Sequence, residues 1–202
     1  MGAGLTLSKR SGQPDDALVA SRLVYDSDPP YYDFLFASER AALSALNRLW
    51  LEKTGSLSHA GMTVWLETGQ LTALASHYPA QQAAVLDETD EALLAADDEC
   101  LGRSAKLAWL FPHIPAQAWY LRTLAVASRL RGRGAGSLIL QDIAGTALRR
   151  GATELHTDVD SGNPGAVRFY LRHGFEIVTE TRVPMLEPFN LPASYRMVKK
   201  LA

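Results

Sequence analysis

The stretch that decides the fold reads Arg129-Leu130-Arg131-Gly132-Arg133-Gly134-Ala135-Gly136-Ser137. It follows a strand-like run, Trp119 to Val126, and precedes a helical run that reaches Arg150. Glycine lets a backbone approach an anion closely, and the free N–H groups and the dipole at a helix start favour phosphate oxygens. The stretch therefore predicts a phosphate-binding loop between a strand and a helix.

Other interpretations of such a loop make specific demands. A P-loop needs a lysine after its last glycine, and here Ser137-Leu138 follows. A dinucleotide fold has its glycines near the first strand and an acidic residue about twenty positions on. Glu154 lies near that distance, but the loop comes late in the chain. A plain tight turn remains the structural alternative.

A second motif begins about thirty residues after the loop and reads Asn163-Pro164-Gly165-Ala166-Val167-Arg168-Phe169-Tyr170-Leu171-Arg172-His173-Gly174-Phe175. The two motifs together, Arg-x-x-Gly-x-Gly and then Asn-x-x-Ala-x-x-Phe-Tyr-x-x-x-Gly-Phe, resemble the paired acetyl-coenzyme A (acetyl-CoA) signature of the GNAT superfamily of N-acetyltransferases. The resemblance is specific over residues 120–175. Residues 5–25 and 62–76 are similar only in general form to the first strand, first helix and central hairpin of the superfamily.

The resemblance implies how acetyl-CoA is held. The strand would present the backbone groups of Leu124, Ala125 and Val126 to the pantetheine arm and the acetyl carbonyl. Asn163 would bind the pantetheine, although Asn before Pro also suits an ordinary helix N-cap. The residues implied to cradle the pyrophosphate are Arg131, Gly132, Arg133, Gly134, Ala135, Gly136 and Ser137.

The resemblance also implies a chemistry. The N–H of Val126 would polarise the thioester carbonyl, and Tyr170 would give its phenolic proton to the departing sulfur. An alkylamine has a pKa of about 10.4, so its deprotonation at neutral pH needs a base, a water chain or a site that lowers that pKa. Asp158, Glu67 and His156 are candidates, and none stands out. Asp158 and His156 share one face of a strand.

We therefore expect an N-acetyltransferase that moves the acetyl group of acetyl-CoA to a primary amine by direct attack in a ternary complex. A catalytically silent acyl-CoA-binding module of the same fold is the alternative. Retention of Tyr170 favours the enzyme. Nucleic-acid binding through the arginines around the loop is disfavoured, because the 3′-phosphate end of CoA accounts for several of them.

Periodicity predicts one α/β or α+β domain over residues 1–202, and the resemblance makes its mixed sheet mostly antiparallel, flanked by helices, with strands that splay around the CoA site. The helices expected span residues 14–25, 28 to about 55, 134–150 and 164–173. The strands expected span residues 5–10, 62–76 as a hairpin around Thr68-Gly69, 119–126, 154–159, 175–183 and 195–201, the last being an edge strand that could pair in a homodimer.

Composition limits the partners. The chain has 202 residues, 47% of them hydrophobic, with a net charge of −2, so no positive field collects nucleic acid or an anionic membrane. No apolar run reaches membrane-spanning length, and the start lacks a secretory signal. A single cysteine, Cys100, gives no disulfide or CxxC metal site. These features favour a cytoplasmic protein without a metal.

An acidic helical insertion is expected at about residues 79–115, where the family resemblance ends. From Ala80 to Gly102 there is no lysine or arginine. Such a charge run is either a solvated helical face or a surface that attracts a cationic amine acceptor. Trp109, Phe111 and His113 follow it and could line the same mouth. The seven acids are Asp87, Glu88, Asp90, Glu91, Asp97, Asp98 and Glu99.

Overall fold

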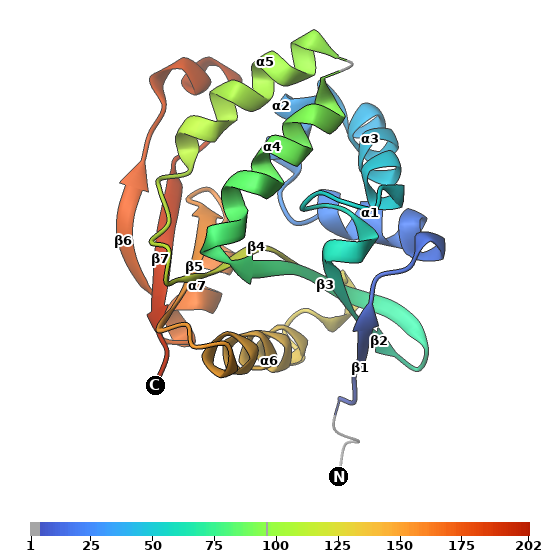
Figure 1. Cartoon of the computed structure of the whole chain (residues 1–202), viewed down its shortest axis with the longest axis vertical. Helices are drawn as coiled ribbons and strands as arrows, with labels where there is room; N and C mark the ends of the chain where they lie inside the picture. The colour runs from blue at the N-terminus through green and yellow to red at the C-terminus, as the bar shows by residue number, and fades with distance from the viewer. Residues whose placement is uncertain (1–4, 96) are drawn as a thin grey trace.

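The computed structural model describes residues 5–95 and 97–202, and its centre is a seven-stranded sheet in the order β1-β2-β3-β4-β5-β7-β6 (Figure 1). Every neighbouring pair of strands is antiparallel except β4 and β5, which are parallel. The predicted mixed, mostly antiparallel α/β fold is therefore confirmed. The start of the chain, residues 1–4, lies outside the described residues.

Most helices and strands lie close to the ranges expected from the sequence. The strands are β1 (Ser8–Ser11), β2 (Met62–Glu67), β3 (Gln70–Pro79), β4 (Trp119–Val126), β5 (Glu154–Asp160), β6 (Glu176–Thr181) and β7 (Ser194–Lys200). The helices are α1 (Ala17–Tyr25), α2 (Pro29–Phe36), α3 (Glu39–Leu51), α4 (Ala83–Leu94), α5 (Asp98–Leu107), α6 (Ala135–Arg149) and α7 (Pro164–Arg172).

The sheet separates two apolar cores. Helices α1, α2 and α3, with the insertion helices α4 and α5, cover one face, where Leu46 and Leu74 are buried (Figure 1). Helices α6 and α7 cover the other face, where Ile139 and Leu155 are buried. Because strand side chains alternate between faces, β2, β3 and β4 contribute buried residues to both cores.

Two local features explain where elements begin and end. The hairpin between β2 and β3 turns at Thr68 and Gly69, with φ of 51° and 83°, as the type I′ geometry requires. The single helix expected from residue 28 to about 55 is wrong, because α2 ends at Ala37 with φ of 68° and Ser38 caps α3 through the Ala41 N–H. Ser38 before Glu39 is a helix start signal that the apolar periodicity hid.

The expected edge position of the last strand is also wrong. β7 pairs with β5 on one side and with β6 on the other, so its ladder groups are already used. The edges of the sheet are β1 and β6. Pairing between subunits through residues 195–201 is therefore excluded in this fold.

β4 and β5 separate soon after they meet. They pair only from Trp119 to Leu121 on β4, opposite Leu155 to Thr157 on β5. β4 continues along β3 as far as Val126, with a bulge at Arg122, where the register shifts between Leu121 and Thr123. The predicted splay of the two strands is therefore present, and it opens a gap beyond Thr157.

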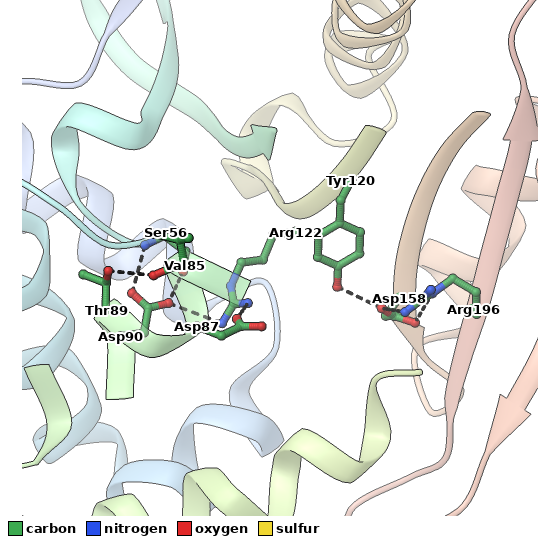
Figure 2. Close-up of polar contacts among 9 residues, drawn as sticks. All are labelled: Ser56, Val85, Asp87, Thr89, Asp90, Tyr120, Arg122, Asp158 and Arg196. Carbon is green, nitrogen blue, oxygen red and sulfur yellow. Dashed lines mark hydrogen bonds and ion pairs between the residues drawn. The ribbon is translucent and has the colours of Figure 1, made fainter. Parts of the chain in front are cut away.

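A buried ion pair joins β5, β7 and the end of the insertion. Arg196 and Asp158 are register partners whose side chains are each 3% exposed, and Nε and Nη2 of Arg196 donate to the carboxylate at 2.8 and 2.9 Å (Figure 2). Arg196 also donates to the carbonyl of Pro112 at 2.6 Å. The Tyr120 hydroxyl donates to Asp158 at 2.8 Å. One arginine therefore fixes three segments.

Arg196→Met should lower the free energy of unfolding by about 3–5 kcal/mol, because it leaves the Asp158 carboxylate buried without its cation. Arg182→Met is the matched control, since Arg182 is 68% exposed in its pair with Glu180 and its loss should cost under about 1 kcal/mol. Urea unfolding measures both. Equal losses in the two variants would show that the buried pair does not hold the fold.

Candidate active site

The backbone of β4 faces the gap with unpaired groups. The Ala127 N–H donates to the Thr72 carbonyl of the β3 side at 2.8 Å. Because backbone groups alternate along an antiparallel strand, the N–H of Ala125 also points to β3, and those of Leu124 and Val126 point into the gap. The Val126 carbonyl accepts from Nε of Arg131 at 2.9 Å, which ties the glycine loop to the end of the strand.

The glycine loop ends at the N-terminus of α6. Gly132 and Gly134 have φ of 73° and 87°, a left-handed conformation that a side chain would strain, although an added Cβ would meet nothing within 4 Å. Gly134 is the N-cap of α6, and no side chain in the described part of the chain caps this helix. Its first N–H groups are therefore available to an anion.

Gly136 and Ser137 contact α7. A Cβ at Gly136 would lie 3.2 Å from the ring of Phe169, so this glycine allows α6 and α7 to approach closely. The ring of His173 bridges the Phe169 carbonyl, 2.7 Å from Nδ1, and the Ser137 hydroxyl, 2.9 Å from Nε2. Since a carbonyl only accepts, Nδ1 is the donor, and Nε2 then accepts from Ser137. Motif spacing gave no sign of this link.

Asn163 caps α7, with its side-chain oxygen accepting from the Ala166 N–H at 3.0 Å. The N-cap interpretation of Asn163 is therefore confirmed. Phe169 packs against the core between the sheet and α6, in agreement with its interpretation as a core residue.

Tyr170 lies near the point where β4 and β5 stop pairing, on the face of the sheet that α6 and α7 cover. Burial raises the pKa of Tyr170 to about 12, and a hydrogen bond with the Thr157 side chain acts in the opposite direction. Thr157 is the last residue of β5 that pairs with β4. The phenol of Tyr170 therefore keeps its proton at neutral pH and is able to donate it.

Each base suggested by the sequence already has a partner. Glu67 pairs with Arg129 of the glycine loop. His156, which is 5% exposed, lies with Nε2 at 3.0 Å from Glu154. Asp158 accepts from Tyr120 and Arg196 on both carboxylate oxygens (Figure 2).

This geometry disfavours Asp158 as a general base, because its oxygens are buried and held by a cation. Asp158 instead positions Tyr120 and Arg196. The structure also shows which face of the sheet Asp158 occupies. Side chains alternate along β5, so Thr157 and Val159 point toward α6 and α7, and Asp158 points to the opposite face.

Acids of the insertion bind within the protein. Asp87 and Asp90 on α4 pair with Arg122 at 3.1 and 3.6 Å, and Asp90 also accepts from the Ser56 N–H at 2.9 Å (Figure 2). Asp97 caps α5 through the Cys100 N–H.

The charge run is therefore partly structural. It neutralises the arginine at the β4 bulge, and Glu99 pairs with Arg103 on α5. Among the seven acids, those that are exposed and have neither a hydrogen bond nor an ion pair with another described residue are Glu88, Glu91 and Asp98.

A small cleft of about 50 Å³ lies on the Asp158 face of the sheet. It is formed by the turn before α2, the end of β5, the segment before β7 and the end of the insertion. Asp28 and Asp160 supply carboxylates, and Tyr31 and Phe111 supply rings whose centroids are 6.1 Å apart. Sequence reasoning missed Asp28 and Asp160, because Asp28 before two prolines has the pattern of a helix cap.

The described residues contain no group of three or more His, Cys, Asp or Glu side chains arranged to hold a metal ion. None of their helices combines the length and the apolar character needed to cross a bilayer.

Solved structures share the fold along nearly the whole chain. An acetyltransferase that is 24% identical aligns with a TM-score of 0.68 over 96% of this chain and 100% of its own. An N-acetyltransferase from Staphylococcus aureus Mu50, 15% identical, aligns with a TM-score of 0.72 over 95% and 99% of the two chains. The PaiA N-acetyltransferase from Thermoplasma acidophilum, solved in complex with coenzyme A, is 13% identical and aligns with a TM-score of 0.56 over 97% and 99%.

Sequence comparison places the chain in a family. No curated protein matches it in sequence. The model of the acetyltransferase (GNAT) family matches residues 23–175, which include the glycine loop, the gap and the motif that begins at Asn163. The chain therefore belongs to the GNAT acetyltransferase family.

Proposed function

We propose that this protein transfers the acetyl group of acetyl-CoA to a primary amine, by direct attack in a ternary complex. The observation that carries the proposal is the gap between β4 and β5, which has unpaired backbone groups along one edge and the uncapped N-terminus of α6 at its end. A ligand with amides along its length and a diphosphate at one end matches both features.

Acetyl-CoA would bind as an added strand. Its pantetheine amides pair with the free backbone groups of Leu124, which leaves the Val126 N–H for the acetyl carbonyl, and its diphosphate lies on the first N–H groups of α6. Arg133 and Arg131 add positive charge beside the diphosphate, and Asn163 contacts the pantetheine from the start of α7. The PaiA complex with coenzyme A supports a coenzyme A ligand for this fold.

The transfer then needs three groups. The uncharged amine nitrogen attacks the thioester carbonyl, and the Val126 N–H stabilises the oxygen that becomes negative. When the C–S bond breaks, the sulfur takes the proton of the Tyr170 hydroxyl. The Tyr170 oxygen then regains a proton from the nitrogen that has formed the new C–N bond. A silent acyl-CoA-binding module would have no need of a buried phenol at this position.

Saturating acetyl-CoA should raise the melting temperature, because it binds the native chain alone. Gly134→Val should reduce that shift, since valine is strained at φ of 87° at the diphosphate-binding turn. Gly151→Val is the matched control, because Gly151 has φ of 82° at the far end of the same helix. An equal ligand-induced shift in both variants would contradict the loop assignment.

Tyr170→Phe should lower kcat by about 10²-fold and leave the acetyl-CoA melting shift unchanged, because it removes the proton donor and keeps the ring. Release of free thiol from acetyl-CoA in the presence of amines measures turnover. An unchanged kcat would reduce Tyr170 to a core residue. Absence of thiol release from the wild-type protein with every amine tested would favour the silent module.

A further inference from the structure

The small cleft and the proposed cofactor site lie on opposite faces of one gap. Along β5, Thr157 points toward Tyr170 and the helices α6 and α7, and Asp158 and Asp160 point to the other face. Beyond Thr157 no strand pairs with β5 on the β4 side. The cleft therefore lies on the face of the sheet opposite to Tyr170, beside the part of β5 that has no partner on the β4 side.

The cleft carries negative charge that the protein does not neutralise. Of its three carboxylates, Asp158 is paired with Arg196. No ion pair among the described residues includes Asp28 or Asp160. Asp160 accepts from the Gly162 N–H, and Oδ1 of Asp28 accepts from the Tyr31 N–H at 3.2 Å. Neither carboxylate therefore has a cationic partner among the described residues.

Asp28 differs from the other acids in its environment. Burial, and then the charge of Asp160, raise the pKa of Asp28 to about 7. Burial also raises the pKa of Asp160. The third carboxylate of the cleft, Asp158, is neutralised by Arg196. On the neighbouring elements, Asp26 pairs with Arg22, and Asp87 and Asp90 bind Arg122. Asp28 is thus able to exchange a proton near neutral pH.

We propose that Asp28 and Asp160 hold the ammonium group of the acetyl acceptor in this cleft, and that Asp28 is the base that removes its proton. This inference rests on the proposed acetyl transfer. The cleft's volume of about 50 Å³ admits the end of a slender chain, and the rings of Tyr31 and Phe111 suit a cation carried on methylene groups. The acceptor class is therefore an unbranched primary alkylammonium.

The proton balance is simple. The alkylammonium gives one proton to the Asp28 carboxylate and becomes the neutral amine, whose lone pair forms the C–N bond. The second nitrogen proton replaces the one that Tyr170 gives to the sulfur. Asp28 then returns its proton to solvent, so one acetyl transfer yields the amide, free CoA thiol and one proton.

The test compares Asp28→Asn with Asp26→Asn, using n-butylamine and acetyl-CoA in the full chain. Asparagine caps a helix as well as aspartate does, so the substitution at Asp28 removes only the charge. Asp26 lies in the same turn, outside the cleft, and pairs with Arg22. We expect kcat/KM for the amine to fall about 10²-fold in Asp28→Asn alone, with the KM for acetyl-CoA unchanged.

The pH profile separates a base from a structural residue. A carboxyl with its pKa raised to about 7 is protonated below that pH, so wild-type kcat/KM should rise with pH through about 7. Asp28→Asn should lose this limb. Asp160→Asn should keep it, moved to lower pH because the charge of Asp160 no longer raises the pKa of Asp28, and should raise the KM for the amine about tenfold. Wild-type kinetics in Asp28→Asn, with transfer intact, would overturn the inference and leave the proposed function standing.

A binding measurement tests the cleft without turnover. Titration of n-butylammonium chloride, followed by NMR chemical shifts, should show binding that weakens about tenfold in Asp28→Asn and not in Asp26→Asn. Neutral n-butanol should not bind. Equal affinity for n-butylammonium in both variants would overturn the assignment of the cleft, and absence of thiol release with intact amine binding would instead count against acetyl transfer.

Discussion

The arrangement of the site depends on one constraint, the loss of pairing between β4 and β5 after three residues. β3 holds one edge of β4 as far as Val126, and β7 holds the far edge of β5. The two edges that face each other keep their N–H and C=O groups without ladder partners. Unpaired backbone groups at this depth require a partner, and an extended ligand supplies one without rearranging the sheet. The bulge at Arg122 allows the strands to diverge.

Because side chains alternate along β5, the two faces of the sheet beside the gap carry different chemical groups. On β5, Thr157 meets the phenol of Tyr170 on the side of α6 and α7, and the next residue, Asp158, joins the Arg196 network on the other side. The two faces therefore differ in polarity: one holds a neutral proton donor among rings, and the other holds carboxylates. In the proposed transfer, the proton donor for the departing sulfur would stand on one face, and the carboxylates that receive the ammonium group would stand on the other.

The insertion shows why charge in a sequence does not by itself identify a binding surface. Seven acids in residues 80–102, a range without lysine or arginine, suggest a surface that attracts a cationic ligand. In the fold, Asp87 and Asp90 meet Arg122, which lies more than thirty residues away in sequence. Among the three carboxylates of the small cleft, those without a cation are Asp28 and Asp160, which stand in segments of the sequence without a run of acids. Whether a group of acids has excess negative charge therefore depends on which cations lie near it in the fold, and not on its neighbours in the sequence.

The sequence by itself determined the family, the glycine loop, the limits of β4, and the cap at Asn163, because each depends on residues that are neighbours along the chain. Local periodicity missed the break at Ala37, and it placed the last strand at an edge, because strand order depends on pairing between distant segments. The role of Asp158 and the cleft around Asp28 were decided only by the tertiary structure. A carboxylate's chemistry depends on burial and on the nearest cation, and both come from residues far away in the sequence.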